Sequence, residues 1–407
     1  MLVLVILLSA PDWTQFGGPS GQGLVEDSLP AAIDADSPTW RTELPGRGWS
    51  SPIVTGKQVW VTTALDDGRD LRAVATDRET GRIVHDVGLF QPREVQEIHG
   101  QNSHASPTPC AWRSLVVCHF GRYGTAAIDT SSGEVVWRNT DYPIEHQGGP
   151  GSSPMIAADR VILTLDGADA SFVVALNPET GEEVWRRDRS APKRPNPITH
   201  RAFATPLITE HDGRTLVVSP GADQMHAYDA ATGDEVWHVR YVGFSTVPQP
   251  ARWEDRIIFC TGFFRPSLQA VSLGGRGNVT DSHIAWTFNG PVPDIPSPVV
   301  VGDFVWIVSD KGVLTAIDAR TGKRVDASRA KGNYNASPLA ILGGESPELL
   351  LGNREGELVR VAITDAGVGP EASVTARIDL NEAIYATPTL IDGALFVRTE
   401  QAIYRFD

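Results

Sequence analysis

The stretch Ala127-Ile128-Asp129-Thr130-Ser131-Ser132-Gly133-Glu134-Val135-Val136-Trp137 indicates the fold, because the chain repeats it. The shared pattern is Ala-x-(Asp/Asn)-x-x-(Thr/Ser)-Gly-x-x-x-Trp, and two further copies end at Trp185 and Trp237. Degraded copies carry His85 and Asp326 at the tryptophan position, and a looser copy ends at Trp286. The glycines at 81, 133, 181 and 233 are spaced by 52, 48 and 52 residues. This period of about 50 residues is typical of an array of supersecondary units.

A second string gives the number of units. It is a proline, usually preceded by Ser or Thr, followed by alternating apolar residues. It occurs at Pro52, Pro107, Pro154, Pro206, Pro248, Pro298, Pro338 and Pro388. The chain therefore contains eight units.

Each unit has the pattern of four short strands separated by turns. In the unit that starts at Pro298, β-branched runs alternate with turn residues such as Gly302-Asp303 and Asp310-Lys311-Gly312. Four-stranded units repeated every 40–50 residues predict an all-β, eight-bladed propeller of antiparallel blades. The last unit has only three strands, so we expect the N-terminal segment 39–44 to close it, with Trp40 at the repeat position. The repeat tryptophans are expected to pack between blades.

This repeat resembles the tryptophan-docking repeat of the pyrroloquinoline-quinone (PQQ) propellers, over about residues 40–407. That superfamily includes quinoprotein alcohol dehydrogenases and outer-membrane assembly factors of the BamB type. The resemblance implies the fold, with either a binding scaffold or an oxidoreductase as the function. PQQ and Ca²⁺ are possible cofactors but are disfavoured, because the chain has no adjacent cysteine pair and little length beyond eight blades. No catalytic residue is carried over.

Composition excludes some partners. The chain has 407 residues, with 35 basic and 50 acidic side chains and a net charge of −15, which disfavours binding to nucleic acid. Residues 1–10 have the length and apolarity of a signal-peptide core, although no Lys or Arg precedes them. Export to the periplasm or the exterior, with no transmembrane helix in the mature chain, is the favoured interpretation, and a buried N-terminal strand is the alternative. Residues 11–39 are expected to form an irregular arm.

Strand direction predicts where a binding site could be. In each blade, the loop that enters the first strand and the turn between the second and third strands should lie on one face, around the mouth of the central channel. A protein, a polysaccharide or a small molecule could bind there, because these segments combine aromatic and polar side chains. The candidate ligand-binding residues are Arg47, Trp49, His104, Arg122, Tyr123, His146, Asp166, His200, Arg201, Asp223, Arg265, Asn333 and Tyr334.

Three functions remain open for this face. The first is a non-catalytic binding or assembly scaffold, and the second is a quinoprotein-like oxidoreductase with a PQQ–metal site. The third is a metal-dependent hydrolase or lyase, in which His104, His146, His200 and Asp166 would converge on a metal. The spacing of these four residues follows the blades, so it is not a metal-ligand signature.

Overall fold

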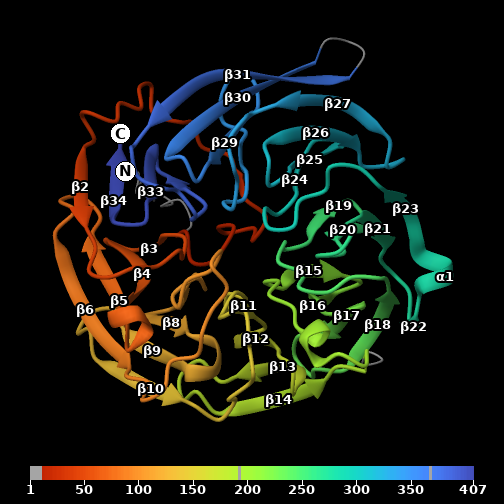
Figure 1. Ribbon diagram of the computed structural model, residues 1–407, viewed down its shortest axis with the longest axis horizontal. Helices are drawn as coiled ribbons and strands as arrows, with labels where there is room; N and C mark the ends of the chain where they lie inside the picture. The colour runs from red at the N-terminus through yellow and green to blue at the C-terminus, as the bar shows by residue number, and fades with distance from the viewer. Residues whose placement is uncertain (1–11, 191–193, 366–368) are drawn as a thin grey trace, which may run out of the picture.

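A computed structural model describes residues 12–190, 194–365 and 369–407. Eight β-sheets are arranged around a central axis, each with its first strand innermost and its last strand on the perimeter (Figure 1). The fold class predicted from the repeats, an eight-bladed propeller of mainly four-stranded antiparallel sheets, is confirmed.

The first four blades follow one another along the chain. Blade 1 comprises β3 (Ile53–Thr55), β4 (Gln58–Leu65), β5 (Asp70–Asp77) and β6 (Ile83–Phe90). Blade 2 comprises β7 (Cys110–Trp112), β8 (Leu115–His119), β9 (Thr125–Asp129) and β10 (Val135–Asn139). Blade 3 comprises β11 (Met155–Ala157), β12 (Arg160–Asp166), β13 (Ser171–Leu176) and β14 (Glu183–Asp188). Blade 4 comprises β15 (Leu207–His211), β16 (Arg214–Pro220), β17 (Gln224–Asp229) and β18 (Glu235–Arg240), with β22 (Gly277–Asn278) added in parallel at its outer edge.

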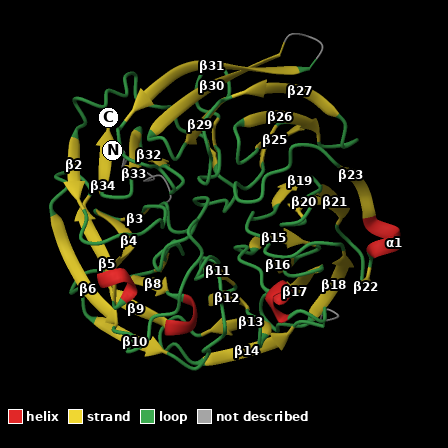
Figure 2. Cartoon of the chain, in the orientation of Figure 1, coloured by secondary structure: helices red, strands yellow, loops and turns green. Residues whose placement is uncertain are grey.

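The other four blades complete the ring. Blade 5 comprises β19 (Ala251–Trp253), β20 (Arg256–Cys260), β21 (Leu268–Ser272) and β23 (Ile284–Phe288), and α1 (Thr280–His283) lies between β22 and β23. Blade 6 comprises β24 (Val299–Val301), β25 (Phe304–Val308), β26 (Val313–Asp318) and β27 (Arg324–Arg329). Blade 7 comprises β28 (Leu339–Ile341), β29 (Glu348–Gly352), β30 (Glu357–Asp365) and β31 (Pro370–Asp379), with β1 (Leu24–Val25) at its inner edge. Blade 8 comprises β32 (Thr389–Ile391), β33 (Ala394–Arg398), β34 (Ala402–Phe406) and β2 (Trp40–Glu43). Three 3₁₀ turns, η1 (Asp66–Gly68), η2 (Gly121–Tyr123) and η3 (Pro197–His200), lie in the connections (Figure 2).

The last blade is closed by the N-terminal strand, as predicted. β2 pairs antiparallel with β34, with Trp40 opposite Arg405. The two ends of the propeller chain therefore share one sheet, which removes a free strand edge.

Four tryptophans at the repeat position link neighbouring blades, whereas the indole N–H of the buried Trp237 has no partner among the described residues. The indole N–H of Trp137 donates to the carbonyl of Pro178 in the next blade, at 2.9 Å, and its ring lies against Gly181. Trp185, Trp286 and Trp40 make the same contact with the carbonyl three residues before Gly233, Gly322 and Gly81. These glycines have φ values of 71–75°, so they suit the turn as well as the close approach of the ring.

The start of each first strand is marked by Pro, preceded by a hydroxyl residue in seven blades and by Gln249 in blade 5. At two blades the structural equivalents differ from the predicted prolines. Blade 2 starts after Thr108-Pro109 rather than at Pro107, and blade 5 after Gln249-Pro250 rather than at Pro248. Both segments have two prolines two residues apart, so the sequence alone did not distinguish the register.

The segment before β2 crosses the end of the channel opposite the mouth. It contacts first strands of five blades. These contacts are Trp13 with Val54, the carbonyl of Thr14 with the N–H of Ala111, Gln15 with Ile156, Gln22 with Arg252, and β1 with β28. None of the helices in the described parts of the chain is long and apolar enough to cross a membrane.

Candidate functional site

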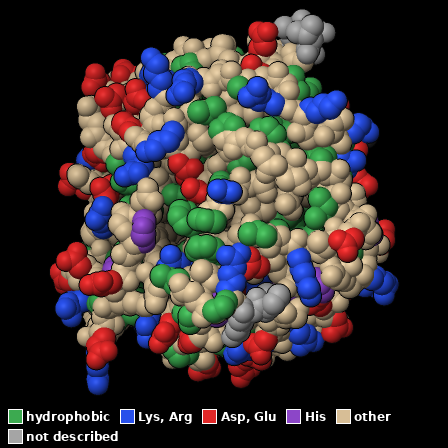
Figure 3. All heavy atoms as spheres, turned by 45° about the vertical axis from the view of Figure 1, so that its right-hand side comes forward, with side chains coloured by type: hydrophobic (Ala, Val, Ile, Leu, Met, Phe, Trp, Pro, Cys, Tyr) green, Lys and Arg blue, Asp and Glu red, His purple; other side chains and the backbone are tan. Residues whose placement is uncertain are grey.

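A cavity of about 500 Å³ lies at the centre of the propeller. All eight blades contribute to its lining, either with the loop before the first strand or with the turn between the second and third strands. Phe16, from the segment that crosses the opposite end, also lines it. The cavity volume is within the range of small-ligand sites. Hydrophobic side chains gather in the middle of the face shown in Figure 3, with charged side chains beside them.

The inner wall of the cavity is a ring of hydroxyl side chains. The backbone N–H of Ser51 donates to the Thr108 hydroxyl at 2.9 Å, and the N–H of Thr108 donates to the Ser153 hydroxyl at 3.0 Å. The same bond links Ser153 to Thr205, Gln249 to Ser297, Ser297 to Ser337, Ser337 to Thr387, and Thr387 back to Ser51. Gln249, the one ring member without a hydroxyl, donates its amide N–H to the carbonyl of Pro206. Each blade is thus tied to the next at the channel wall.

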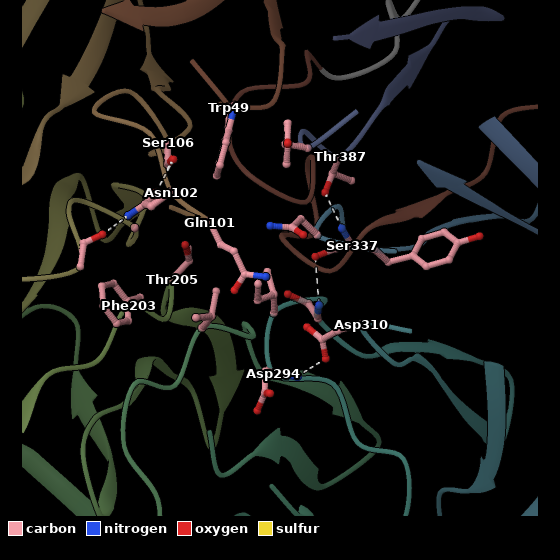
Figure 4. A pocket seen from close by; sticks show the side chains of 18 of the residues that line it. Trp49, Gln101, Asn102, Ser106, Phe203, Thr205, Asp294, Asp310, Ser337 and Thr387 are labelled. Atoms are coloured by element: carbon pink, nitrogen blue, oxygen red, sulfur yellow. Dashed lines mark hydrogen bonds between the residues drawn. The ribbon is translucent and has the colours of Figure 1, made fainter. Parts of the chain in front are cut away.

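Two carboxylates lie together on one side of this wall. The backbone N–H of Asp294 donates to Oδ2 of Asp310 at 2.8 Å, and Figure 4 shows both side chains across the cavity from Trp49. Burial, followed by the charge of Asp310, raises the pKa of Asp294 to about 6. Burial also raises the pKa of Asp310, although backbone N–H groups oppose this shift. Asp294 therefore changes its charge close to neutral pH.

Aromatic rings and basic side chains also line the cavity. Trp49 and Tyr385 stack with ring centroids 3.9 Å apart and an interplanar angle of 13°. The guanidinium of Arg354 lies 6.0 Å from the Tyr385 ring, and that of Arg201 lies 6.0 Å from the Phe203 ring. The cavity thus offers flat apolar surfaces next to positive charges.

Three of the thirteen candidate residues line the cavity. They are Trp49, Arg201 and Tyr334. Arg47 lies beside Trp49, with its guanidinium 5.9 Å from the ring, and pairs with Glu400.

The other nine candidates do not line the cavity, and most of them have partners of their own. Asp166 accepts two hydrogen bonds from Arg189 in a buried ion pair. Asp223 pairs with Arg194, and the Asn333 side chain donates to Glu355. Arg122 donates to Gln96, the Tyr123 hydroxyl accepts the Gln96 N–H, and His200 binds the carbonyl of Arg194. Arg265 follows the exposed Phe264 in the β20–β21 turn.

The histidines proposed as metal ligands have separate surroundings. His104 packs near Tyr123, and His146 packs edge-on against Phe203 and binds the carbonyl of Ala202. Burial lowers the pKa of His146 to about 4, so this side chain is neutral at neutral pH. Within the described residues, no group of three or more His, Cys, Asp or Glu side chains is placed to hold a metal ion.

Several lining residues were not among the candidates. They are Phe16, Asp294, Asp310, Lys311, Arg354, Tyr385 and the ring hydroxyls. Asp310 and Lys311 belong to a turn between second and third strands, so the rule for the mouth face already included them. The Ser or Thr before each Pro was used only to count units, although its side chain faces the channel.

Comparisons with known proteins agree with this architecture. A curated relative, the outer membrane protein assembly factor BamB of Burkholderia pseudomallei, is 24% identical over 287 residues, 68% of each chain. The tetrathionate hydrolase of Acidithiobacillus ferrooxidans is 24% identical over 218 residues, 48% of this chain and 38% of that protein. This chain thus matches less than two fifths of the hydrolase's length.

Solved structures share the fold at low identity. BamB from Moraxella catarrhalis superposes with a TM-score of 0.59 at 16% identity, covering 91% of this chain and 99% of that one. A europium-containing methanol dehydrogenase has a TM-score of 0.66 at 11% identity, covering 96% and 90%. A family model described as outer membrane protein assembly factor BamB matches residues 31–161 and 169–407. With the blades and the docking tryptophans described above, this match shows that the chain belongs to the BamB-like family of PQQ propellers.

Proposed function

We propose that this protein is a non-catalytic binding scaffold of the cell envelope or exterior, which holds its partner at the mouth face of the propeller. Membership of the BamB-like family supports an assembly role and an envelope location. The proposal requires that the mouth face be suited to binding another molecule, and the described side chains support this requirement.

The observation that carries the proposal is a patch of exposed apolar side chains beside the cavity. Val242, Phe263 and Phe264 are 74%, 52% and 65% exposed, and they lie in neighbouring loops of blades 4 and 5. Phe263 packs edge-on against Phe244, and the two residues form a β-bridge. Exposed apolar residues gathered on one face mark interaction sites, whereas isolated ones are normal.

The other exposed apolar side chains make a useful contrast. Most lie singly on the outer strands of different blades, as Val136 does on β10 and Val184 on β14. Phe264 and Arg265 at the tip of the patch both have positive φ, at 74° and 65°, as do the consecutive residues Asp66 and Asp67. Non-glycine residues are costly there, at about 1 kcal/mol or more each, and such conformations cluster at functional sites.

The test places a photo-crosslinking amino acid at Phe264 and, as a matched control, at Val136. In cells that express the full chain, we expect protein adducts from position 264 and none above background from position 136. The double variant Val242→Ser/Phe264→Ser should lose the adducts formed by a crosslinker at the neighbouring Phe244, whereas Val136→Ser/Val184→Ser should keep them. Equal crosslinking from both positions would contradict a partner at the mouth face.

The oxidoreductase alternative is supported by the similarity of fold to quinoprotein dehydrogenases and by the cavity volume. Against it, the described acidic and histidine side chains do not form the cluster that a metal beside the quinone would need. Titration with PQQ, with and without Ca²⁺, followed by the fluorescence of Trp49, distinguishes the two functions. Saturable one-to-one quenching beyond a free-tryptophan control would favour the oxidoreductase. No observation favours the hydrolase or lyase, because its proposed ligands have separate partners.

A further inference from the structure

The hydroxyl ring has unused hydrogen-bond donors. Each of its seven hydroxyls accepts a backbone N–H, and within the described residues none of the seven donates to a protein acceptor. A Ser or Thr hydroxyl carries one O–H donor that rotates to suit its neighbour. Six of these side chains, all except Ser297, are at least nine-tenths buried, and all seven line the cavity. The wall therefore presents a ring of donors that a ligand rich in acceptors can satisfy.

The same cavity is lined by basic side chains that have no acidic partner. Arg201, Lys311 and Arg354 come from blades 4, 6 and 7, and across the described parts of the chain none of them forms an ion pair. Within the part of the chain that the structure describes, Arg201 donates only its Nε–H, to the Ser245 hydroxyl at 3.0 Å, and its outer guanidinium nitrogens have no partner there. Some arginines elsewhere in the protein do form ion pairs, as Arg72 and Arg360 do, although others do not.

A fourth cation lies behind the ring. Arg398 is 1% exposed, and its guanidinium donates to the carbonyl and the hydroxyl of Ser50, next to the ring residue Ser51. No carboxylate of the described residues lies within 4 Å of it, and its Nε is buried without an acceptor. Burial lowers the pKa of Arg398 to about 9, which leaves it charged at neutral pH. A buried charge without a partner is costly, and its field acts strongly through a poorly screened interior.

The charge balance of the cavity differs from that of the whole chain. Two carboxylates, Asp294 and Asp310, face three lining cations, with Arg398 behind the wall, whereas the protein has a net charge of −15. A protein with this composition would be expected to present acidic groups at a random surface hollow. The excess of donors and cations therefore indicates that the ligand carries a negative charge.

We propose that the cavity receives the carboxylate group of its ligand, held by the ring hydroxyls together with Arg201, Lys311 and Arg354. This inference rests on the proposed function, since it names the chemistry of what is bound at the mouth. A carboxylate group fits better than a phosphate group, because its two oxygens match hydroxyl donors and guanidinium forks. A carboxylate group also brings one negative charge next to Asp294 and Asp310, where a phosphate dianion would bring two. The stacked Trp49–Tyr385 pair would cover the apolar part of the ligand. The carboxylate can belong to a free small molecule or to an acidic segment of a protein partner.

Isothermal titration of the full chain at low salt tests this inference with three probes. They are citrate, an acetylated and amidated tetraglutamate peptide, and inorganic phosphate. We expect saturable binding of at least one carboxylate probe, with phosphate at least about tenfold weaker. Binding of citrate alone assigns a free small carboxylate, and binding of the peptide assigns an acidic segment. If neither carboxylate binds saturably, or if phosphate binds as tightly, the proposal is overturned.

Variants locate the site. Arg201→Gln/Arg354→Gln should weaken carboxylate binding by at least about tenfold. Lys311→Gln, on an exposed side chain that folding does not need, should weaken it about threefold. The matched control is Arg113→Gln, because Arg113 is equally basic but lies in the β7–β8 turn, away from the mouth. An equal loss in the Arg113 variant would show general charge attraction and would contradict the site.

The two proposals can fail separately. Val242→Ser/Phe264→Ser removes the apolar patch without changing a cavity residue, so it should abolish the protein adducts and leave citrate or peptide binding unchanged. Adducts without any carboxylate binding would overturn this inference alone. Carboxylate binding without adducts would overturn the protein scaffold and leave the cavity as a small-ligand site.

Discussion

The perimeter and the mouth of this propeller are built from the same repeated unit, yet they differ in regularity. On the perimeter, one contact recurs, in which a ring from one blade donates to a carbonyl and lies on a glycine of the next. At the mouth, each blade contributes a different loop, with carboxylates from blade 6, stacked aromatics from blades 1 and 8 and arginines from blades 4 and 7. The difference indicates that the recurring contacts hold the blades together, whereas the blade-specific loops carry the binding chemistry.

The largest effect should come from breaking a perimeter contact. A Cβ at Gly181 would lie 2.4 Å from the Trp137 ring, and the residue has a φ of 73°. Gly181→Ala should therefore lower the free energy of unfolding by about 3 kcal/mol, because backbone strain and overpacking act together. Gly302→Ala is the control, since Gly302 also has positive φ but has nothing within 4 Å of the added carbon. Measured by urea unfolding, Gly302→Ala should lower the free energy of unfolding by about 1 kcal/mol. If both variants lost the same amount, the docking contact would contribute little to stability.

A mouth substitution should separate binding from stability. Arg398→Met removes a buried cation that has no carboxylate partner among the described residues, and apolar replacement of buried charges is often close to neutral for folding. We expect carboxylate affinity to fall by roughly three- to tenfold, while unfolding changes by no more than about 1 kcal/mol. Titration calorimetry and urea unfolding measure the two quantities. A large loss of stability with unchanged affinity would place Arg398 among the structural residues instead.

The acidic pair predicts a pH dependence at the mouth. The pKa of Asp294 is about 6 in the folded chain and lower in the unfolded chain. The charged carboxylate therefore lowers the free energy of unfolding above pH 6, and the protein becomes more stable as the pH falls through 6. Because water partly screens this side chain, the charged form should lower the free energy of unfolding at pH 7.5 by only about 1 kcal/mol. Asp294→Asn should then be more stable than the parent at pH 7.5 and no more stable at pH 4. Carboxylate binding should tighten as pH falls through 6, with Asp310 and Lys311 as the neighbouring charges, and this change should flatten in the variant.

The two regions also differ in how far the sequence predicted them. The Gly-x-x-x-Trp spacing recurs because several blades share the same docking contact, and it predicted the closing strand at Trp40, while the recurring Pro predicted the eight blades. The cavity has no such recurrence, since its chemistry comes from single residues in unlike loops. Trp49, Arg201 and Tyr334 were found from their position before a first strand. Tyr385 has the same position before β32, and Arg354 lies in the turn between β29 and β30, so the rule for the mouth face included both although neither was among the candidates. Asp166 and Asp223 lie at the expected turns between second and third strands, but their carboxylates pair with Arg189 and Arg194. Such pairing depends on three-dimensional neighbours, which one sequence does not reveal.

The smallest effect concerns the one perimeter copy that has histidine in place of tryptophan. Nε2 of His85 donates to the carbonyl of Thr130 at 3.0 Å, and its ring lies on Gly133. This carbonyl is three residues before the glycine, as in the tryptophan copies, so the contact is kept although the residue has changed. His85→Trp should therefore change the free energy of unfolding by less than about 1 kcal/mol. The larger buried apolar area is offset by crowding against Trp60, whose ring centroid lies 5.6 Å from that of His85. His85→Ala should lower the free energy of unfolding by more, about 1–2 kcal/mol, since it removes the ring that lies on Gly133 and one of the two donors to the Thr130 carbonyl, the other being the side-chain amide of Gln58. If the alanine variant were as stable as the parent, the recurring hydrogen bond would not explain the regular perimeter, and burial of the ring alone would have to account for it.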